Sequence, residues 1–413
     1  MTSNEPPGYY PRRTPRPRAR RTATASAQIC LGNGSARAPV TTDAGPSPVA
    51  GCAVPSSERT WVVQAVRFLT EERQRADETP LVAVPCPELP DITIMLKDES
   101  THPSGSLKHR LAQALFVHAI CNGDIGPETV IIEASSGSTA ISEAWFARQL
   151  GLSFVAVVPR TTVPAKISAI RAQGGEIVLA GDGEDLCELA ARIAIDRGGF
   201  FMDQFGRAAE ATDWRGANNI AENMMDQIYR RGLDAPAWFV TGAGTGGTSA
   251  TIGRYLRLRP ELARTRLCVV DPDGSAYFKA FVSGDCAIAG RSSPIVEGIG
   301  RGRVASAFQP GVIDHMIAVA DSGSVAGALW LAERTDRRFG PSSGTNLIGA
   351  LLLGQAMQRR GEAGTIVMLG CDGGDRYHET IYNPLWCEKQ GLVLEGWNRM
   401  LARLGSPAFP AAY

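Results

Sequence analysis

The chain has 413 residues and no net charge at neutral pH, with 44% hydrophobic and 20% charged residues. This length is enough for two α/β units with sizeable cores, and the composition is that of a globular protein rather than a disordered one. The sequence contains no apolar run of the roughly 18 residues that a membrane helix needs, and its nine cysteines form no CxxC pair that would indicate structural zinc.

Residues 1–58 differ from the rest of the chain. They hold seven arginines and three acidic residues, a net charge of +4, so the remainder carries −4. The segment is rich in Pro, Ser, Thr and Ala and has almost no apolar periodicity, which predicts a disordered tail. Its arginines are also typical of an organellar transit peptide, or of a phosphate-binding arm. The mildly acidic remainder argues against nucleic-acid binding.

From residue 59 onward, strand-like and helix-like segments alternate along the chain. We predict helices at Trp61–Leu69, Leu107–Ile120, Thr139–Leu150, Pro164–Gln173, Glu184–Asp196, Thr248–Leu258, Ser324–Arg334 and Thr345–Met357. We predict strands at Ile92–Leu96, Val130–Ile132, Phe154–Val158, Ile177–Leu179, Trp238–Val240, Leu267–Val270, Met316–Val319 and Thr365–Leu369. This alternation indicates parallel sheets built from right-handed βαβ units, and the strands are too many for one comfortable sheet. Two α/β lobes are therefore expected, with ligands bound in the loops that follow strands.

The most informative of these loops is GAGTGGT at 242–248, which lies between a predicted strand and a predicted helix. Glycines let the backbone approach an anion closely, and the following helix directs its first amides at that anion. A phosphate site is the natural interpretation, with a plain tight turn as the alternative. Gly242, Gly244 and Gly247 also match the G-x-G-x-x-G dinucleotide spacing, and Asp271 follows a later strand, so spacing alone leaves that hypothesis open.

Three further polar loops also precede predicted helices. In KDESTHPSGSLKHR at 97–110, Lys108 opens a helix, where the helix dipole disfavours a cation and a lowered pKa would make the amine a nucleophile. The alternative is a solvated surface lysine. The segment EASSGSTA at 133–140 offers hydroxyls and free amides suited to a carboxylate. The segment GPSSGTN at 340–346 is another hydroxyl-bearing turn before a helix. Simple helix caps are the alternative for both segments.

Taken together and in this order, the motifs PSGSLKHR, SSGST, MDQF, GTGGT and the late SSG resemble the fold-type II pyridoxal-phosphate enzymes, in particular the cysteine synthase and cystathionine β-synthase family. The resemblance implies a tryptophan synthase β-like α/β fold with two doubly wound lobes and pyridoxal 5'-phosphate between them. It implies that Lys108 bonds the cofactor, and that the cofactor is also bound by Ser138, Gly244, Thr245, Gly246, Gly247, Thr248 and Ser342, with Ser342 facing the pyridine nitrogen. It implies that the substrate carboxylate is bound by Ser135, Ser136, Gly137, Thr139 and Gln204.

The resemblance covers roughly residues 59–395 and also suggests how the chain is divided. We expect a large cofactor-binding lobe from residues 59–103 and 215–400, a small substrate lobe from 104–214 and a C-terminal tail from 401–413. We expect a homodimer that acts on a small amino acid, with no nucleic-acid, membrane or metal partner. The scattered cysteines favour a cytoplasmic protein, while the Arg-rich tail leaves organellar import open.

Two positions depart from the family pattern. Ser138 stands where the family usually has an Asn that bonds the ring oxygen of the cofactor, and His109 follows the lysine where Asp is usual. These changes resemble a branch of cysteine desulfhydrases, so we predict a lyase that converts L-cysteine to hydrogen sulfide, pyruvate and ammonia by β-elimination. The alternative is cysteine synthase-type β-replacement on O-acetylserine or a related activated serine. Gln204 in MDQF argues against a hydroxyl-eliminating dehydratase, and a catalytically inactive binding protein is the remote alternative.

Overall fold

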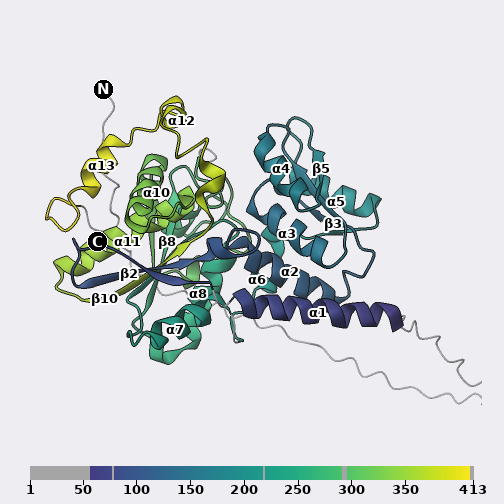
Figure 1. Ribbon diagram of the computed structural model, residues 1–413, viewed down its shortest axis with the longest axis horizontal. Coiled ribbons are helices and arrows are strands. Elements are labelled where there is room, and N and C mark those ends of the chain that lie inside the picture. The colour runs from purple at the N-terminus through teal and green to yellow at the C-terminus, as the bar shows by residue number, and fades with distance from the viewer. Residues whose placement is uncertain (1–55, 77–78, 217–218, 291–294, 410–413) are drawn as a thin grey trace, which may run out of the picture.

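The computed structural model describes residues 56–76, 79–216, 219–290 and 295–409 (Figure 1). The predicted tail lies outside these ranges except for residues 56–58, which begin helix α1 (Ser56–Ala76) instead of continuing the tail. Within the described part of the chain, no helix has the length and apolar character to cross a membrane.

The smaller of two sheets is parallel throughout. Its described strands follow the order β5-β4-β3-β6 and are β3 (Ile131–Glu133), β4 (Phe154–Val158), β5 (Glu176–Leu179) and β6 (Phe200–Phe201). One face packs against α1, α2 (Lys108–Asn122), α3 (Ser138–Gln149) and α4 (Pro164–Ala172), and the other packs against α5 (Leu186–Asp196). Every residue of β3 and β4 is buried, as expected for central strands covered on both faces.

The larger sheet has the described order β1-β2-β10-β7-β8-β9. Its strands are β1 (Leu81–Val84), β2 (Ile92–Asp98), β7 (Trp238–Gly242), β8 (Arg266–Pro272), β9 (His315–Val319) and β10 (Gly364–Gly370). Only the β1–β2 pair is antiparallel among the described pairings. Alternate residues of each strand face opposite sides, so Trp238 and Val240 enter one core while Phe239 enters the other.

Helices cover both faces of the larger sheet. One core includes residues from α10 (Asp321–Thr335), α11 (Pro341–Arg359) and α13 (Glu395–Leu401), and the opposite core includes residues from α7 (Ile220–Arg230), α8 (Gly247–Leu258) and α9 (Tyr277–Ser283). Figure 1 shows the two sheets with their helices as separate halves of the molecule, with α1 extended along one side. The prediction of two doubly wound α/β lobes is therefore confirmed.

The chain ends do not follow the predicted division. Helix α1 packs on α2, and its Ala65 and Leu69 belong to the core of the smaller sheet, although residues 59–103 were assigned to the large lobe. At the other end, residues 401–409 are not a loose tail, because Leu404 and Phe409 are buried in the core of the larger sheet. The apolar residues of both segments pack against residues that are distant in the sequence, so the sequence alone does not show which core each segment joins. The remaining boundaries stay a prediction.

Several elements of the structure were missed by the sequence analysis. Helix α6 (Gln204–Ala211), helix α12 (Pro384–Lys389), strand β1 and strand β6 were not predicted, nor were α7, α9 and α13. The edge strand β1 has four residues and β6 has two, lengths at which an alternating pattern cannot be distinguished from a loop.

Helix α11 is buried all around from Pro341 to Met357, and it is packed tightly against α10. A methyl carbon added at Gly344 would overlap the backbone oxygen of Ser324 and the backbone nitrogen of Ala328. Neither backbone atom can move without shifting α10. The glycine therefore sets the distance between the two helices beside the larger sheet.

We expect Gly344→Ala to lower the free energy of unfolding by about 3 kcal/mol, the upper range for overpacking, because the overlap is with backbone. Chemical denaturation of the purified protein measures this change. Gly396→Ala is the matched control, since Gly396 is helical and an added carbon there meets nothing within 4 Å. The control should gain about 0.5–1 kcal/mol. Equal stability of both variants would contradict the close helix contact.

Candidate active site

A cavity of about 520 Å³ lies between the two lobes. Loops at the carboxyl ends of β3, β7 and β10 contribute to its walls, as expected for open parallel sheets. The cavity brings together every residue predicted to bind cofactor or substrate, namely Lys108, Ser135, Ser136, Gly137, Ser138, Thr139, Gln204, Gly244, Thr245, Gly246, Gly247, Thr248 and Ser342.

The glycine loop after β7 is shaped by close backbone contacts. Gly246 has φ of 90°, and a Cβ there would lie 2.6 Å from the Cα of Phe308. Gly246 also caps α8, so the first amides of that helix face the cavity lined by Gly247 and Thr248. A loop that combines these glycines with a helix N-terminus provides backbone N–H donors for an anion.

Lys108 is the first residue of α2 and lines the cavity with a half-buried side chain. Burial lowers the pKa of its amine, although the neighbouring Cys371 and Asp372 oppose that shift. The direction agrees with the sequence-based expectation, and burial is its largest cause. The alternative of a solvated surface lysine is wrong. A lowered pKa increases the fraction of neutral amine that can act as a nucleophile or base.

The loop between β3 and α3 forms the small-lobe wall of the cavity. Thr139 Oγ1 donates a hydrogen bond to Oε1 of Gln204 over 2.6 Å, and Gln204 N donates to Oε2 of Glu133 over 3.1 Å. Oε1 of Glu133 accepts from Ala134 N at 2.7 Å. Burial raises the pKa of Glu133 to about 7. This carboxyl group therefore fixes both the start of the loop and the backbone of Gln204.

The large-lobe wall includes Ser342 on the first turn of α11 and Asp372 just after β10. Tyr377 Oη donates to Oδ2 of Asp372 over 2.7 Å, and both side chains are buried. Burial raises the pKa of Asp372, while the positive charge of Arg376 and the bond from Tyr377 oppose the shift. The hydroxyl of Ser342 and the carboxyl of Asp372 thus present two different polar groups to one cavity.

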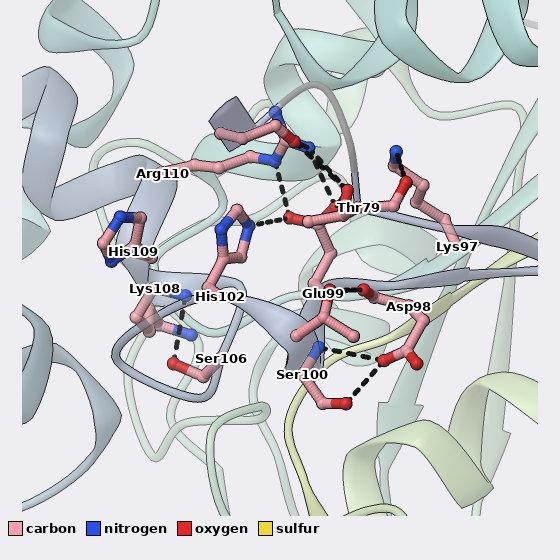
Figure 2. A network of polar contacts seen from close by, with 12 residues as sticks. Thr79, Lys97, Asp98, Glu99, Ser100, His102, Ser106, Lys108, His109 and Arg110 are labelled. Carbon is pink, nitrogen blue, oxygen red and sulfur yellow. Dashed lines mark hydrogen bonds and ion pairs between the residues drawn. The ribbon is translucent and has the colours of Figure 1, made fainter. Parts of the chain in front are cut away.

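The turn from β2 to Lys108 is held by a buried polar network (Figure 2). Glu99, which is fully buried, accepts from Nε of Arg110 at 2.5 Å, from Nη2 of Arg110 at 2.9 Å and from the Thr79 hydroxyl at 2.8 Å. His102 Nε2 lies 2.8 Å from the same carboxylate. The network therefore connects the end of β2, in the larger sheet, with α2, on the smaller one.

His109, the residue after Lys108, lies in the same region. Its ring is 4.9 Å from that of His102, its Nδ1 is 3.1 Å from Ser104 Oγ, and its Nε2 is 3.3 Å from Oε1 of Glu72 on α1. Burial lowers the pKa of His109, and contact with His109 is the main cause that lowers the pKa of Glu72. Both directions fit a neutral imidazole beside an ionised carboxylate.

Sequence reasoning missed several residues that line the cavity. Asp372 lies three residues after the predicted strand Thr365–Leu369, so the rule that ligands lie at strand ends could have found it. Glu297 lines the cavity and forms an ion pair with Lys166 of α4 at 2.9 Å. No pattern in the loop around Glu297 indicated this position. Asp271, weighed as a dinucleotide ligand, instead accepts from the backbone N of Phe278 at 2.8 Å and does not line the cavity.

Comparisons with known proteins show which family the chain belongs to. The family described as pyridoxal-phosphate dependent enzymes matches residues 73–372. The chain is 47% identical over 344 residues to L-cysteine desulfhydrase Cds1 of Mycobacterium tuberculosis, covering 82% of this chain and 93% of that protein. It is 30% identical to a putative cysteine synthase of Sinorhizobium fredii, covering 79% of this chain and 97% of that protein. The crystal structure of O-ureido-L-serine synthase aligns with a TM-score of 0.66 and 26% identity, covering 80% of this chain and 98% of that one. The chain therefore belongs to the family of pyridoxal-phosphate dependent enzymes.

Proposed function

We propose that this protein is a lyase that cleaves the Cβ–S bond of L-cysteine, so that cysteine and water yield hydrogen sulfide, pyruvate and ammonia. The observation that carries the proposal is the 47% identity, over 82% of the chain, to a protein named L-cysteine desulfhydrase. The cavity supports it, because a half-buried lysine, a glycine-rich anion loop and a hydroxyl-rich loop face one space.

The cavity residues fit pyridoxal 5'-phosphate. The loop Gly244–Thr248 leaves no room for a side chain at Gly246, and its amides suit a phosphate group. The lowered pKa of Lys108 favours the neutral amine that bonds an aldehyde. A space of about 520 Å³ is within the range of cofactor sites. We assign the phosphate to Gly244–Thr248, the aldehyde to Lys108 and the ring to Ser138 and Ser342.

Pyridoxal phosphate, when bound, withdraws electrons from Cα of an amino acid and so weakens the bonds around it. The chain supplies the groups that bind, orient and move protons. We assign Lys108 Nζ as the base for the Cα proton, since burial lowers the pKa of this amine and a neutral amine can accept a proton. The same nitrogen is suited to return a proton to the departing sulfur.

We assign the substrate carboxylate to the loop of Ser135, Ser136, Gly137 and Thr139. This loop opens α3, so the positive end of the helix dipole and unpaired backbone amides favour an anion there. Because Thr139 donates to Oε1 of Gln204, the Nε2 amide of Gln204 is left to donate to the carboxylate. The bond from Gln204 N to Glu133 holds this residue in place.

We assign Ser342 to the pyridine nitrogen of the cofactor. A hydroxyl at this position leaves the nitrogen uncharged, whereas an ionised carboxylate would favour its protonated form. The nearby Asp372 is engaged by Tyr377, and burial raises its pKa. Because Ser342 would not favour a charged ring, its place in the cavity would favour loss of the Cβ group over transamination.

Cysteine synthase-type β-replacement on O-acetylserine or a related activated serine is the second candidate function. It is favoured by the 30% identity to a putative cysteine synthase, which covers most of both chains. Both reactions begin with loss of the Cα proton and of the Cβ substituent, so the same residues serve either. The difference lies in whether water or a sulfur nucleophile completes the turnover.

We further propose that the enzyme is a cytoplasmic homodimer. The cysteines in the described residues are all free thiols, which supports a reducing compartment. The dimer proposal rests on the family resemblance.

Lys108→Ala tests the cofactor assignment. We expect the variant to lose borohydride-stable attachment of the cofactor, and its kcat for sulfide release to fall by about 10²–10⁴-fold, the usual contribution of a positioned acid–base group. Lys279→Ala is the control, because Lys279 lies on α9 and does not line the cavity. Mass spectrometry after reduction reports the attachment. Covalent labelling that persists in Lys108→Ala would move the bond to another lysine.

Thr248→Asp tests the phosphate site. Gly246 is unsuitable because any side chain there would overlap the Phe308 backbone, whereas Thr248 lines the cavity on the first turn of α8. A carboxylate beside the phosphate costs about 1–4 kcal/mol per unit charge at 4 Å between effective dielectrics of 80 and 20, so the cofactor Kd should rise about five- to thousandfold. Thr248→Asn keeps the shape without the charge. Equal Kd values for the two variants, by fluorescence titration, would place the phosphate elsewhere.

Ser138→Asn tests the choice between the two reactions. A longer amide reaches farther into the cavity than a hydroxyl, and we expect sulfide release from cysteine to fall relative to cysteine formation from O-acetylserine and sulfide. One exchanged hydrogen bond changes this ratio by about two- to tenfold. Both rates are measured at saturating cofactor, with Ser138→Ala as the control that removes the hydroxyl. An unchanged ratio would leave Ser138 without influence on reaction choice.

A further inference from the structure

Arg376 reaches from the large lobe to two loops of the small lobe. It lies in the short 3-10 helix Gly374–Tyr377, which follows β10. Its Nη1 donates to Oγ of Ser138 over 2.8 Å, and its Nη2 donates to the backbone oxygens of Ser104 and Gly105, each over 3.2 Å. One guanidinium therefore joins the proposed substrate loop, the turn before Lys108 and the segment after β10.

The contact with Ser138 determines where the serine proton can go. A hydroxyl has one proton and two lone pairs, and a guanidinium can only donate. Arg376 thus occupies a lone pair of Ser138 Oγ, and the serine O–H must donate to a different group. Among the residues that the structure describes, no second hydrogen bond to this side chain is formed, and Ser138 lines the cavity. The hydroxyl proton is therefore available to a ligand in the cavity.

The surroundings of Arg376 hold it in this place. The next residue, Tyr377, is anchored by its bond to Asp372, which fixes the backbone of the 3-10 helix. Gly105 has φ of 76°, and a Cβ at this position would approach Nη2 of Arg376 to 3.2 Å. The turn thus leaves room for the guanidinium. Arg376 itself is exposed, so its bonds contribute little to global stability.

We propose that Arg376 is a positioning residue of the cysteine-cleaving site, which rests on the proposed function. It orients the Ser138 hydroxyl as a donor toward the bound cofactor or substrate. A guanidinium behind the oxygen also polarises the O–H bond, which makes Ser138 a stronger donor than an isolated serine.

A double-mutant cycle with Arg376→Ala and Ser138→Ala tests the proposal on the cofactor-loaded enzyme. The first readout is the absorbance maximum of the bound cofactor, which reports groups that bond to it and requires no substrate. The second is the separation of kcat from KM for sulfide release. Arg376→Ala should shift the absorbance maximum in the same direction as Ser138→Ala and lower kcat by about two- to tenfold. It should change neither property further in the Ser138→Ala background.

Two further variants separate positioning from folding. Arg376→Lys keeps a charged donor and should recover part of the spectrum and of kcat. Arg338→Ala is the matched control, because Arg338 is also exposed and bonds His378 in the same region at 2.9 Å without lining the cavity. It should leave the spectrum unchanged.

Additive effects of the two alanine variants, or an unshifted spectrum in Arg376→Ala, would overturn the positioning role. A coupled spectral shift in an enzyme that releases no sulfide from cysteine would support that role and refute the proposed reaction. The two hypotheses can therefore fail separately.

Discussion

The buried carboxylate of Glu99 is the interaction on which the site depends most directly. Burial alone would raise its pKa, but the charges of Arg110 and His102 act in the opposite direction and hold the pKa well below the usual range. Glu99 is therefore ionised. Its partners are Thr79, which precedes β1, His102 in the turn and Arg110 on α2 (Figure 2). Removing one partner from a buried ion pair costs about 3–5 kcal/mol, because the remaining charge stays uncompensated. The turn that presents Lys108 thus has one stable arrangement.

Helix α1 also contributes to the site, through the contact between Glu72 and His109. Glu72 on α1 lies beside His109, and Glu72 and Arg73 line the cavity. Trp61, near the other end of α1, bonds the backbone oxygen of Leu150 over 3.4 Å. Helix α1 is therefore attached to the small lobe near both ends, and the side chain of Glu72 contacts His109, the residue after Lys108. A helix that looks peripheral in sequence supports the proposed catalytic turn.

The sequence allowed prediction of elements whose signal is local. The glycine loop and the SSGST loop were found because each follows an apolar strand and precedes a periodic helix, and this setting places them at the carboxyl edge of a sheet. The contacts among Arg376, Ser138 and Gly105 were not predictable, since they join positions more than 200 residues apart. Glu99 and Arg110 were visible in the motif around Lys108, but only the fold shows that they are buried together. Phe409 was assigned to a tail because an isolated aromatic residue near a chain end has no periodicity to mark its burial.

The placement of helix ends adds positive potential to the walls of the cavity. Helices α2, α3, α6, α8 and α11 begin at Lys108, Ser138, Gln204, Gly247 and Pro341, and each contributes its first or second residue to the cavity. Converging helix N-termini carry partial positive charge and unpaired N–H groups, so a phosphate and a carboxylate are attracted by the backbone itself. The small residues at these helix ends leave space for the ligands. The same positive field opposes protonation of Lys108, in the same direction as its burial. One arrangement of helices thus favours anionic ligands and a neutral lysine together.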